Sequence, residues 1–194
     1  MMRLSAMALI VALPLVAALP GCASPPMDLF TLAAVPGVPG VAAPSRTHSL
    51  ELRRIGLAGY LDRPGIVRST VQYRLQVSDR DRWGEPLGGM LERVFTEDLV
   101  SRMPGTAVFA EAGAISTQPD AVLELDIQRF DADSSGDLVL LAQIAIRHDT
   151  GKRPAIARTL RLTQHLPSDG TQDLVAAMSA LLGQLADRVT EMVR

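Results

Sequence analysis

The sequence contains little of the chemistry on which most enzymes and nucleic-acid-binding proteins depend. Its 194 residues include one cysteine, three histidines and 4% aromatic residues, and the formal net charge is -2. A single cysteine excludes a disulfide within the chain. The mildly acidic balance argues against nucleic acid, whose phosphates require a basic surface. With so few aromatic residues, a core must consist mainly of Leu, Val, Ile and Ala.

Motifs for catalysis, metal binding and nucleotide binding are also missing. No serine occurs in a Gly-x-Ser-x-Gly turn, and neither a Gly-x-x-x-x-Gly-Lys loop nor a Gly-x-Gly-x-x-Gly turn is present. His48, His148 and His165 are far apart and lack the short spacing of metal ligands. Glu124 and Asp126 share one face of an expected strand, where a solvated sheet face explains them better than a catalytic pair. We expect no enzymatic activity, no metal and no cofactor.

The N-terminus has the three-part layout of a secretory signal. Arg3 precedes an almost wholly apolar run over residues 4–19, and Leu19-Pro20-Gly21-Cys22 resembles the lipobox of lipoproteins. The run is shorter than the roughly 20 residues that a membrane-spanning helix needs. We expect residues 1–21 to be a signal peptide, Cys22 to carry the lipid, and residues 22–27 to form a lipidated tether.

The alternative is that Cys22 is a free or core cysteine that follows an ordinary secretory signal. Acylation is favoured because this is the only cysteine and it occupies the position that the lipobox requires. Two or three acyl chains anchor a protein stably, whereas a single chain does so only marginally. Ala23 stands where an Asp would mark inner-membrane retention in enterobacteria. We therefore expect the periplasmic face of the outer membrane.

Residues 28–194 are expected to form a single α+β domain. Apolar and polar residues alternate in several segments, as is typical of half-buried strands. These segments are 28–33, 48–57 (with a bulge expected at Arg54), 71–77, 123–128, 138–148 and 159–163. In the third of them, Val71, Tyr73, Leu75 and Val77 are expected to face the core. A Pro- and Gly-rich stretch at 36–44 predicts a loop, either packed or flexible. Polar turns at 133–137 and 149–152 predict an antiparallel meander of the last three strands.

Two segments have the periodicity of amphipathic helices. The first begins near Pro86, because proline suits a first helical turn, and it ends at Pro104. The second begins near Ser168 or Thr171, either of which is a suitable N-cap. The apolar stripes are Leu87, Met90, Leu91, Val94, Phe95 and Leu99 in the first and Leu174, Met178, Leu181, Leu182, Leu185, Val189 and Met192 in the second. We predict two layers: a mostly antiparallel or mixed β-sheet with both helices on one face.

Two further segments are not explained by periodicity. Tyr60-Leu61-Asp62-Arg63-Pro64-Gly65-Ile66-Val67-Arg68 joins two expected strands, and Arg82-Trp83-Gly84-Glu85-Pro86-Leu87 leads into the first helix. Trp83 is the only tryptophan, and its ring would cover the helix end against the sheet. Either both segments are structural corners, or the loop at 60–68 contacts a partner protein.

These two segments, in this order after a lipobox, resemble the ABC-type transport auxiliary lipoproteins (the PqiC-like group). The resemblance extends from about Asp28 to the C-terminal helix. It implies a non-catalytic outer-membrane component that works with the permease and ATPase of an inner-membrane ABC transporter. It also implies a mammalian-cell-entry (MCE) domain partner, which carries phospholipid across the periplasm.

The resemblance transfers a defined role to Cys22 alone, as the lipid attachment site. Ten other residues transfer only as signature positions: Tyr60, Leu61, Asp62, Arg63, Pro64, Arg68, Arg82, Trp83, Pro86 and Leu87. We expect a lipoprotein that docks a partner and supports envelope integrity, as a monomer or a homo-oligomer. The alternative is an unrelated scaffold lipoprotein for outer-membrane protein insertion or lipopolysaccharide delivery.

Overall fold

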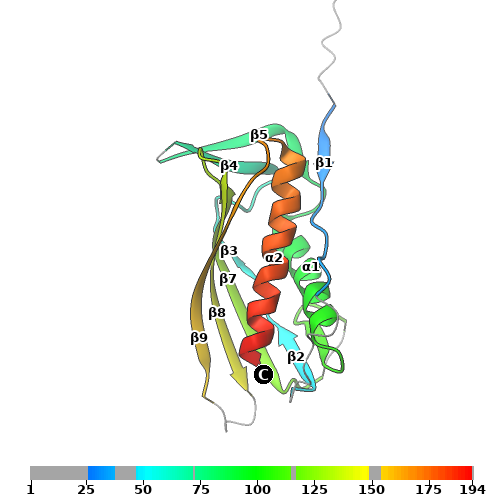
Figure 1. Ribbon diagram of the computed structural model, residues 1–194. Coiled ribbons are helices and arrows are strands. Elements are labelled where there is room, and N and C mark those ends of the chain that lie inside the picture. Colours follow the sequence, from blue (N-terminus) through cyan, green and yellow to red (C-terminus); the bar gives the residue numbers. More distant parts are fainter. Residues whose placement is uncertain (1–25, 38–46, 72, 115–116, 149–153, 194) are drawn as a thin grey trace, which may run out of the picture.

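The computed structural model describes residues 26–37, 47–71, 73–114, 117–148 and 154–193. The expected signal peptide, Cys22, most of the tether, the loop beyond residue 37 and the turn at 149–152 lie outside the described residues. Within the described part, two helices pack on a large mixed sheet, and a smaller sheet crosses one end (Figure 1). The α+β prediction is confirmed.

The large sheet combines an antiparallel meander with parallel strands. β7 (Ala121–Ala132), β8 (Asp137–His148) and β9 (Ile156–His165) pair antiparallel, as the polar turns predicted. β2 (Ser49–Leu52) lies parallel between β6 (Ala107–Ala110) and β7, and β3 (Gly56–Leu57) also pairs parallel with β7. The expected strand at 48–57 is therefore divided in two, and β6 was not predicted.

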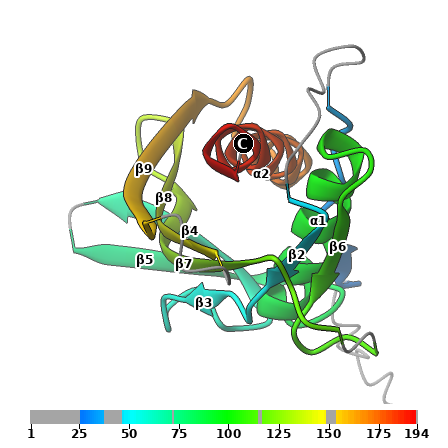
Figure 2. The same ribbon diagram turned by 90° about the horizontal axis from the view of Figure 1, so that it is seen from below.

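Both helices lie on one face of the large sheet, which curls around them (Figure 2). They are α1 (Leu87–Arg102) and α2 (Thr171–Val193). The predicted stripe of α1 is buried in full, and that of α2 is buried except for the partly buried Met192. These side chains form one hydrophobic core with the inward residues of β7 and β8.

The N-cap of α2 is neither of the two residues expected from the sequence. The Leu174 amide donates to the Gly170 carbonyl at 3.1 Å, which makes Gly170 the cap. Ser168 instead accepts a hydrogen bond from the Gly170 amide at 3.0 Å, and the Thr171 hydroxyl donates to Asp81 at 2.6 Å. Thr171 is thus used in a tertiary contact that the local pattern does not contain, and Ser168 in a contact within the loop that precedes the helix.

The small sheet has the order β1 (Asp28–Phe30), β5 (Arg74–Trp83) and β4 (Gly65–Val71). The prediction of one half-buried strand over 71–77 is wrong. The chain reverses around Tyr73, whose φ is 68°, so that Val71 ends β4 while Leu75 and Val77 lie on β5. Val71, Tyr73, Leu75 and Val77 are 59%, 97%, 44% and 37% exposed. Alternation continues on both sides of the turn, and it does not reveal whether a second layer covers the apolar face.

Candidate functional site

The two signature segments meet at the base of the β4–β5 hairpin. The Trp83 amide donates to the Pro64 carbonyl at 2.8 Å, and Gly65 pairs with Arg82 in the ladder. The Gly84 amide donates to the Phe30 carbonyl at 2.9 Å, which ties β1 to the same place. We call this region, residues 60–68 and 82–87, the junction. It connects the strand nearest the expected anchor with the rest of the domain.

A buried carboxylate joins the junction to the large sheet. Asp131 on β7 is 1% exposed, and it accepts hydrogen bonds from the Tyr60 hydroxyl and, at 2.7 Å, from the Ser69 hydroxyl. The Arg129 guanidinium lies 3.2 Å from the same carboxylate. Burial raises the pKa of the Tyr60 phenol, and the neighbouring carboxylate raises it further. Tyr60 therefore stays protonated as a donor, and these contacts provide the partners that a buried charge requires.

The small sheet is also tied to the start of α2. Arg68 donates to the backbone carbonyls of Asp169 at 3.0 Å and Gly170 at 3.2 Å. Together with the bond between Thr171 and Asp81, this links both β4 and β5 to the loop that precedes the helix. Arg68 thus provides hydrogen-bond donors for two backbone carbonyl groups of a structural loop.

Three signature residues belong to the hydrophobic core. Leu61, Trp83 and Leu87 are 2%, 7% and 2% exposed. Trp83 ends β5 four positions before α1 begins, so its ring fills the corner between the small sheet and the helix. At these positions the structural-corner interpretation describes what the side chains do.

The exposed signature residues surround a hollow of about 400 Å³, which we call the junction hollow. Its apolar part comes from Pro64, Trp83, Pro86 and Leu87, and its charged rim from Asp62, Arg63 and Glu85. Glu85 pairs with Arg93 at 2.6 Å. Arg82 is partly exposed and donates to the Asp79 carbonyl at 3.4 Å, within its own strand. An apolar centre with a polar rim has the composition of a protein docking surface.

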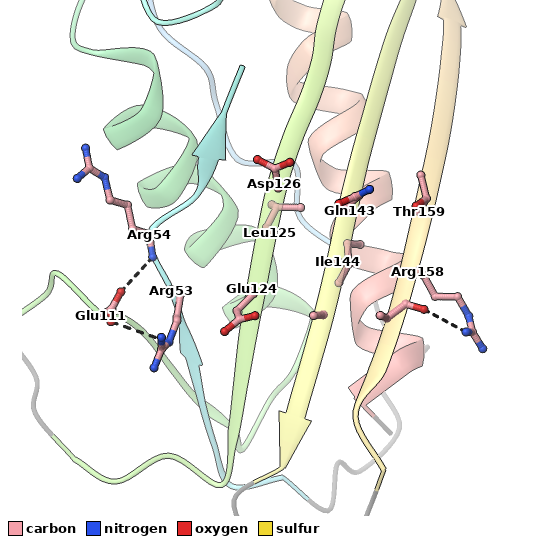
Figure 3. Close-up of a pocket in the computed structure, with 12 residues that line it drawn as sticks. Arg53, Arg54, Glu111, Glu124, Leu125, Asp126, Gln143, Ile144, Arg158 and Thr159 are labelled. Atoms are coloured by element: carbon pink, nitrogen blue, oxygen red, sulfur yellow. Dashed lines mark hydrogen bonds and ion pairs between the residues drawn. The ribbon is translucent and has the colours of Figure 1, made fainter. Parts of the chain in front are cut away.

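A second hollow, of about 600 Å³, lies on the face of the large sheet away from the helices (Figure 3). We call it the sheet-face hollow. Glu111 interacts with Arg53 and accepts from the Arg54 amide, and Glu124 pairs with Arg147 at 2.6 Å. The carboxylate of Glu124 is thus engaged in an exposed ion pair, as on a solvated sheet face. Within the described ranges, no group of three His, Cys, Asp or Glu residues is arranged to hold a metal ion.

The sequence analysis missed a buried polar network between the helices. Asp98 and Arg102 on α1 are 0% and 7% exposed. Asp98 accepts from the Val35 amide at 2.7 Å, and Arg102 donates to the Val35 carbonyl at 2.7 Å and to Asp187 at 2.6 Å. Burial raises the pKa of Asp98 to about 6, although the Val35 amide and Arg102 act against the shift.

This network holds the segment that follows β1 against both helices. Ser179 of α2 also contributes, because its hydroxyl accepts from the Ala33 amide at 3.2 Å. A signal for the network is present in the sequence: Asp98 and Arg102 continue the apolar stripe of α1 one and two turns beyond Phe95. Charged residues at stripe positions, four residues apart, indicate a buried pair.

Comparison with known proteins extends these observations. A family model described as the ABC-type transport auxiliary lipoprotein component matches residues 30–190. None of the curated proteins matches the chain. Within the described residues, no helix is both long and apolar enough to cross a bilayer.

The solved structures with similar folds include the following two. One, a crystal structure of an uncharacterized protein, has a TM-score of 0.73 at 17% identity and covers 88% of this chain and 100% of its own. The other is protein XCC0632 from Xanthomonas campestris, of the DUF330 family. It has a TM-score of 0.66 at 21% identity and covers 84% of this chain and 91% of its own.

Proposed function

Because the chain belongs to the family of ABC-type transport auxiliary lipoprotein components, we propose that it docks an MCE-domain protein at the outer membrane for an ABC-type phospholipid transporter. Its role in transport is auxiliary, as the family description states. Beyond the family description, we propose three things: that the partner is an MCE-domain protein, that the membrane is the outer membrane, and that the protein acts without catalysis. The observation that carries it is the family match, which spans nearly all of both sheets and both helices.

The proposed anchor is a lipid on Cys22. Support comes from the lipobox, from the single cysteine, and from the position of Cys22 six residues before β1. Replacing the thiol removes the attachment atom, so Cys22→Ser should move the protein from the membrane fraction to the soluble periplasm. Mass spectrometry of the native protein should show a processed N-terminus that carries acyl chains.

The proposed docking surface is the junction hollow. Asp62, Arg63 and Pro64 are exposed there above an apolar floor that contains Trp83. The sheet-face hollow is larger, but none of the signature residues lines it. The proposed docking surface does not depend on whether the protein is a monomer or a homo-oligomer.

Co-purification tests the proposal. Affinity-tagged full-length protein, extracted in mild detergent from the envelope of its native host, should recover an MCE-domain protein together with a permease and an ATPase. Recovery of the outer-membrane insertion or lipopolysaccharide-delivery machinery instead would contradict the proposal and favour an envelope-assembly scaffold.

A charge reversal locates the docking surface. Arg63→Glu should lower recovery of the MCE-domain protein at least fivefold, because it places a third negative charge beside Asp62 and Glu85. Arg158→Glu, in the sheet-face hollow, is the matched control and should recover as much as wild type. Equal recovery with both variants would exclude the junction hollow as the docking surface.

A further inference from the structure

Exposed large apolar side chains gather on the small sheet. Among the described residues, seven such side chains are at least 37% exposed, and six of them lie on the small sheet or beside it. These six are Met27, Leu29, Val71, Tyr73, Leu75 and Val77; the seventh is Val100 on α1. Single exposed apolar residues are ordinary, whereas a concentration on one element indicates a contact surface.

The β4–β5 hairpin carries the outer part of this surface. Figure 1 shows it at one end of the domain, and both views show it extending sideways beyond the edge of the large sheet (Figures 1 and 2). Leu75 and Val77 lie two positions apart on one face of β5, and Tyr73 lies at the reversal, 97% exposed. α2 ends at the opposite end of the domain (Figure 1). The apolar residues are therefore confined to the end at which the chain enters the fold.

The length of chain before β1 limits how far this end lies from the anchor. Cys22 precedes Asp28 by six residues, and six fully extended residues span at most about 20 Å. β1 in turn pairs with residues 81–83 of β5, at the base of the hairpin. With a lipid on Cys22, a tether of this length keeps the start of β1, and with it the base of the hairpin, within about 20 Å of the bilayer surface.

The chemistry of the hairpin suits a lipid surface. The outer part of the hairpin, residues 69–78, includes Arg74 and no acidic residue, although the whole chain has a net charge of -2. Arginine near a membrane is attracted to anionic headgroups. Tyrosine is enriched at the membrane–water interface, because its ring is apolar and its hydroxyl is polar.

We propose that the exposed end of the β4–β5 hairpin, with Tyr73 and Val71, contacts the surface of the bilayer that holds the anchor. This inference rests on the proposed lipid at Cys22. The contact provides a second point of attachment, so it fixes the orientation of the domain relative to the bilayer, which a lipid at Cys22 alone does not. Because the junction lies at the base of the same hairpin, the contact also fixes the direction in which the junction hollow faces.

Depth-dependent fluorescence quenching tests the contact in the full-length protein. Tyr73→Cys and Val71→Cys place a thiol on the hairpin, and Val100→Cys is the matched control, since Val100 is an exposed apolar residue on α1. Each variant is purified from membranes, labelled with a thiol-reactive fluorophore and reconstituted into phosphatidylethanolamine–phosphatidylglycerol vesicles that contain a nitroxide-labelled phospholipid. All three substitutions are at exposed positions, so the melting temperature should stay within about 1 °C of wild type.

We expect quenching by the labelled lipid to be at least threefold stronger at positions 71 and 73 than at 100, and quenching by aqueous iodide to follow the opposite order. Equal lipid quenching at all three positions would overturn the inference. Protection of the hairpin label from both quenchers would also overturn it, by showing that a protein or a second copy covers the hairpin.

The number of fluorophores per chain separates this inference from the proposed anchor. If Cys22 is acylated, only the introduced thiol reacts, and mass spectrometry shows one fluorophore. Two fluorophores would show an unmodified Cys22 and would overturn the proposed anchor. One fluorophore without preferential lipid quenching would leave the anchor in place and overturn the hairpin contact alone.

Discussion

The two sheets of this protein use the same sequence pattern with opposite results. On β7 of the large sheet, Leu123 and Ile127 alternate with polar residues and are 0% exposed, because two helices cover that face. On the small sheet, Leu75 and Val77 alternate with polar residues just as regularly and are 44% and 37% exposed. Alternation thus determines which residues share a face of a strand, and the covering layer determines whether that face is buried.

The sheets also differ in how they are attached. The large sheet is held to the helices by a continuous apolar core, whereas the small sheet is joined to it largely by polar contacts at Asp131 and at the start of α2. The small sheet reaches the core at its base, through the buried Ile66 and Trp83 and the partly buried Phe30. We therefore expect substitutions to destabilise the protein strongly under the large sheet, moderately at the joint and hardly at all on the hairpin.

The largest effect should come from the core between the helices and the large sheet. Phe95 is 0% exposed, and Phe95→Ala should lower the free energy of unfolding by about 3–5 kcal/mol, through lost burial and the cavity that remains. Val100→Ala, on the exposed side of the same helix, should change it by less than about 0.5 kcal/mol. Chemical denaturation measures both. Similar values for the two variants would show that α1 is not packed as described.

A pH-dependent effect should come from the buried network that holds the segment after β1. Burial raises the pKa of Asp98 from 3.8 to about 6, so folding favours its neutral form. The neutral Asp98 carboxyl group contributes its full share to the free energy of unfolding below pH 4. This contribution, about 3 kcal/mol, is lost as the pH rises through 6. Asp98→Asn cannot ionise, and its amide oxygen can still accept from the Val35 amide.

The unfolding free energy of wild type should therefore fall relative to that of Asp98→Asn between pH 4 and pH 7. Denaturant titrations at several pH values measure the difference, and groups common to both proteins cancel from it. Parallel curves across this range would show that Asp98 titrates as an ordinary exposed carboxyl group.

A moderate effect is expected at the joint between the sheets. Tyr60→Phe removes one hydrogen bond to the buried carboxylate of Asp131 and should cost about 1–3 kcal/mol. The chain offers a matched control, because its other tyrosine is Tyr73 on the exposed hairpin. Tyr73→Phe should leave the thermal midpoint unchanged. If the two variants melt alike, the phenol contributes nothing to joining the sheets.

The smallest effect on stability should come from the hairpin itself. Leu75 is 44% exposed, and Leu75→Ser should change the free energy of unfolding by less than about 0.5 kcal/mol. A loss near that of Phe95→Ala would mean that a second layer covers the hairpin in solution, which would remove the contrast between the two sheets.

The elements that could be predicted from the sequence are those whose own residues show a regular pattern of apolar and polar positions. Both helices and the meander of β7, β8 and β9 follow from periodicity and polar turns over long stretches. β6 escaped notice because its four residues, Ala107–Ala110, contain no polar alternation. The N-cap of α2 was assigned wrongly because Thr171 donates to Asp81, 90 residues away in sequence.

The candidate site could be predicted only in part, because some of its features depend on contacts between residues far apart in the sequence. The two signature segments are visible as motifs, but their meeting depends on the ladder between β4 and β5 and on β1. Asp131 and Ser69 belong to no recognisable sequence motif. Their role in joining the two sheets appears only when the small sheet is placed against β7. The sequence marked the positions without showing that several of them are structural.

By itself, the sequence determined the class of fold, the two amphipathic helices, the signature segments and the family resemblance, because each depends on residues close together in the chain. Only the tertiary structure decided that Leu75 and Val77 of β5 stay exposed and that Asp98, Arg102 and Asp131 are buried. The physical reason is that a side chain is buried only where a second layer packs on its face. A residue's neighbours in sequence set the direction of its side chain, and distant segments decide whether water can reach it.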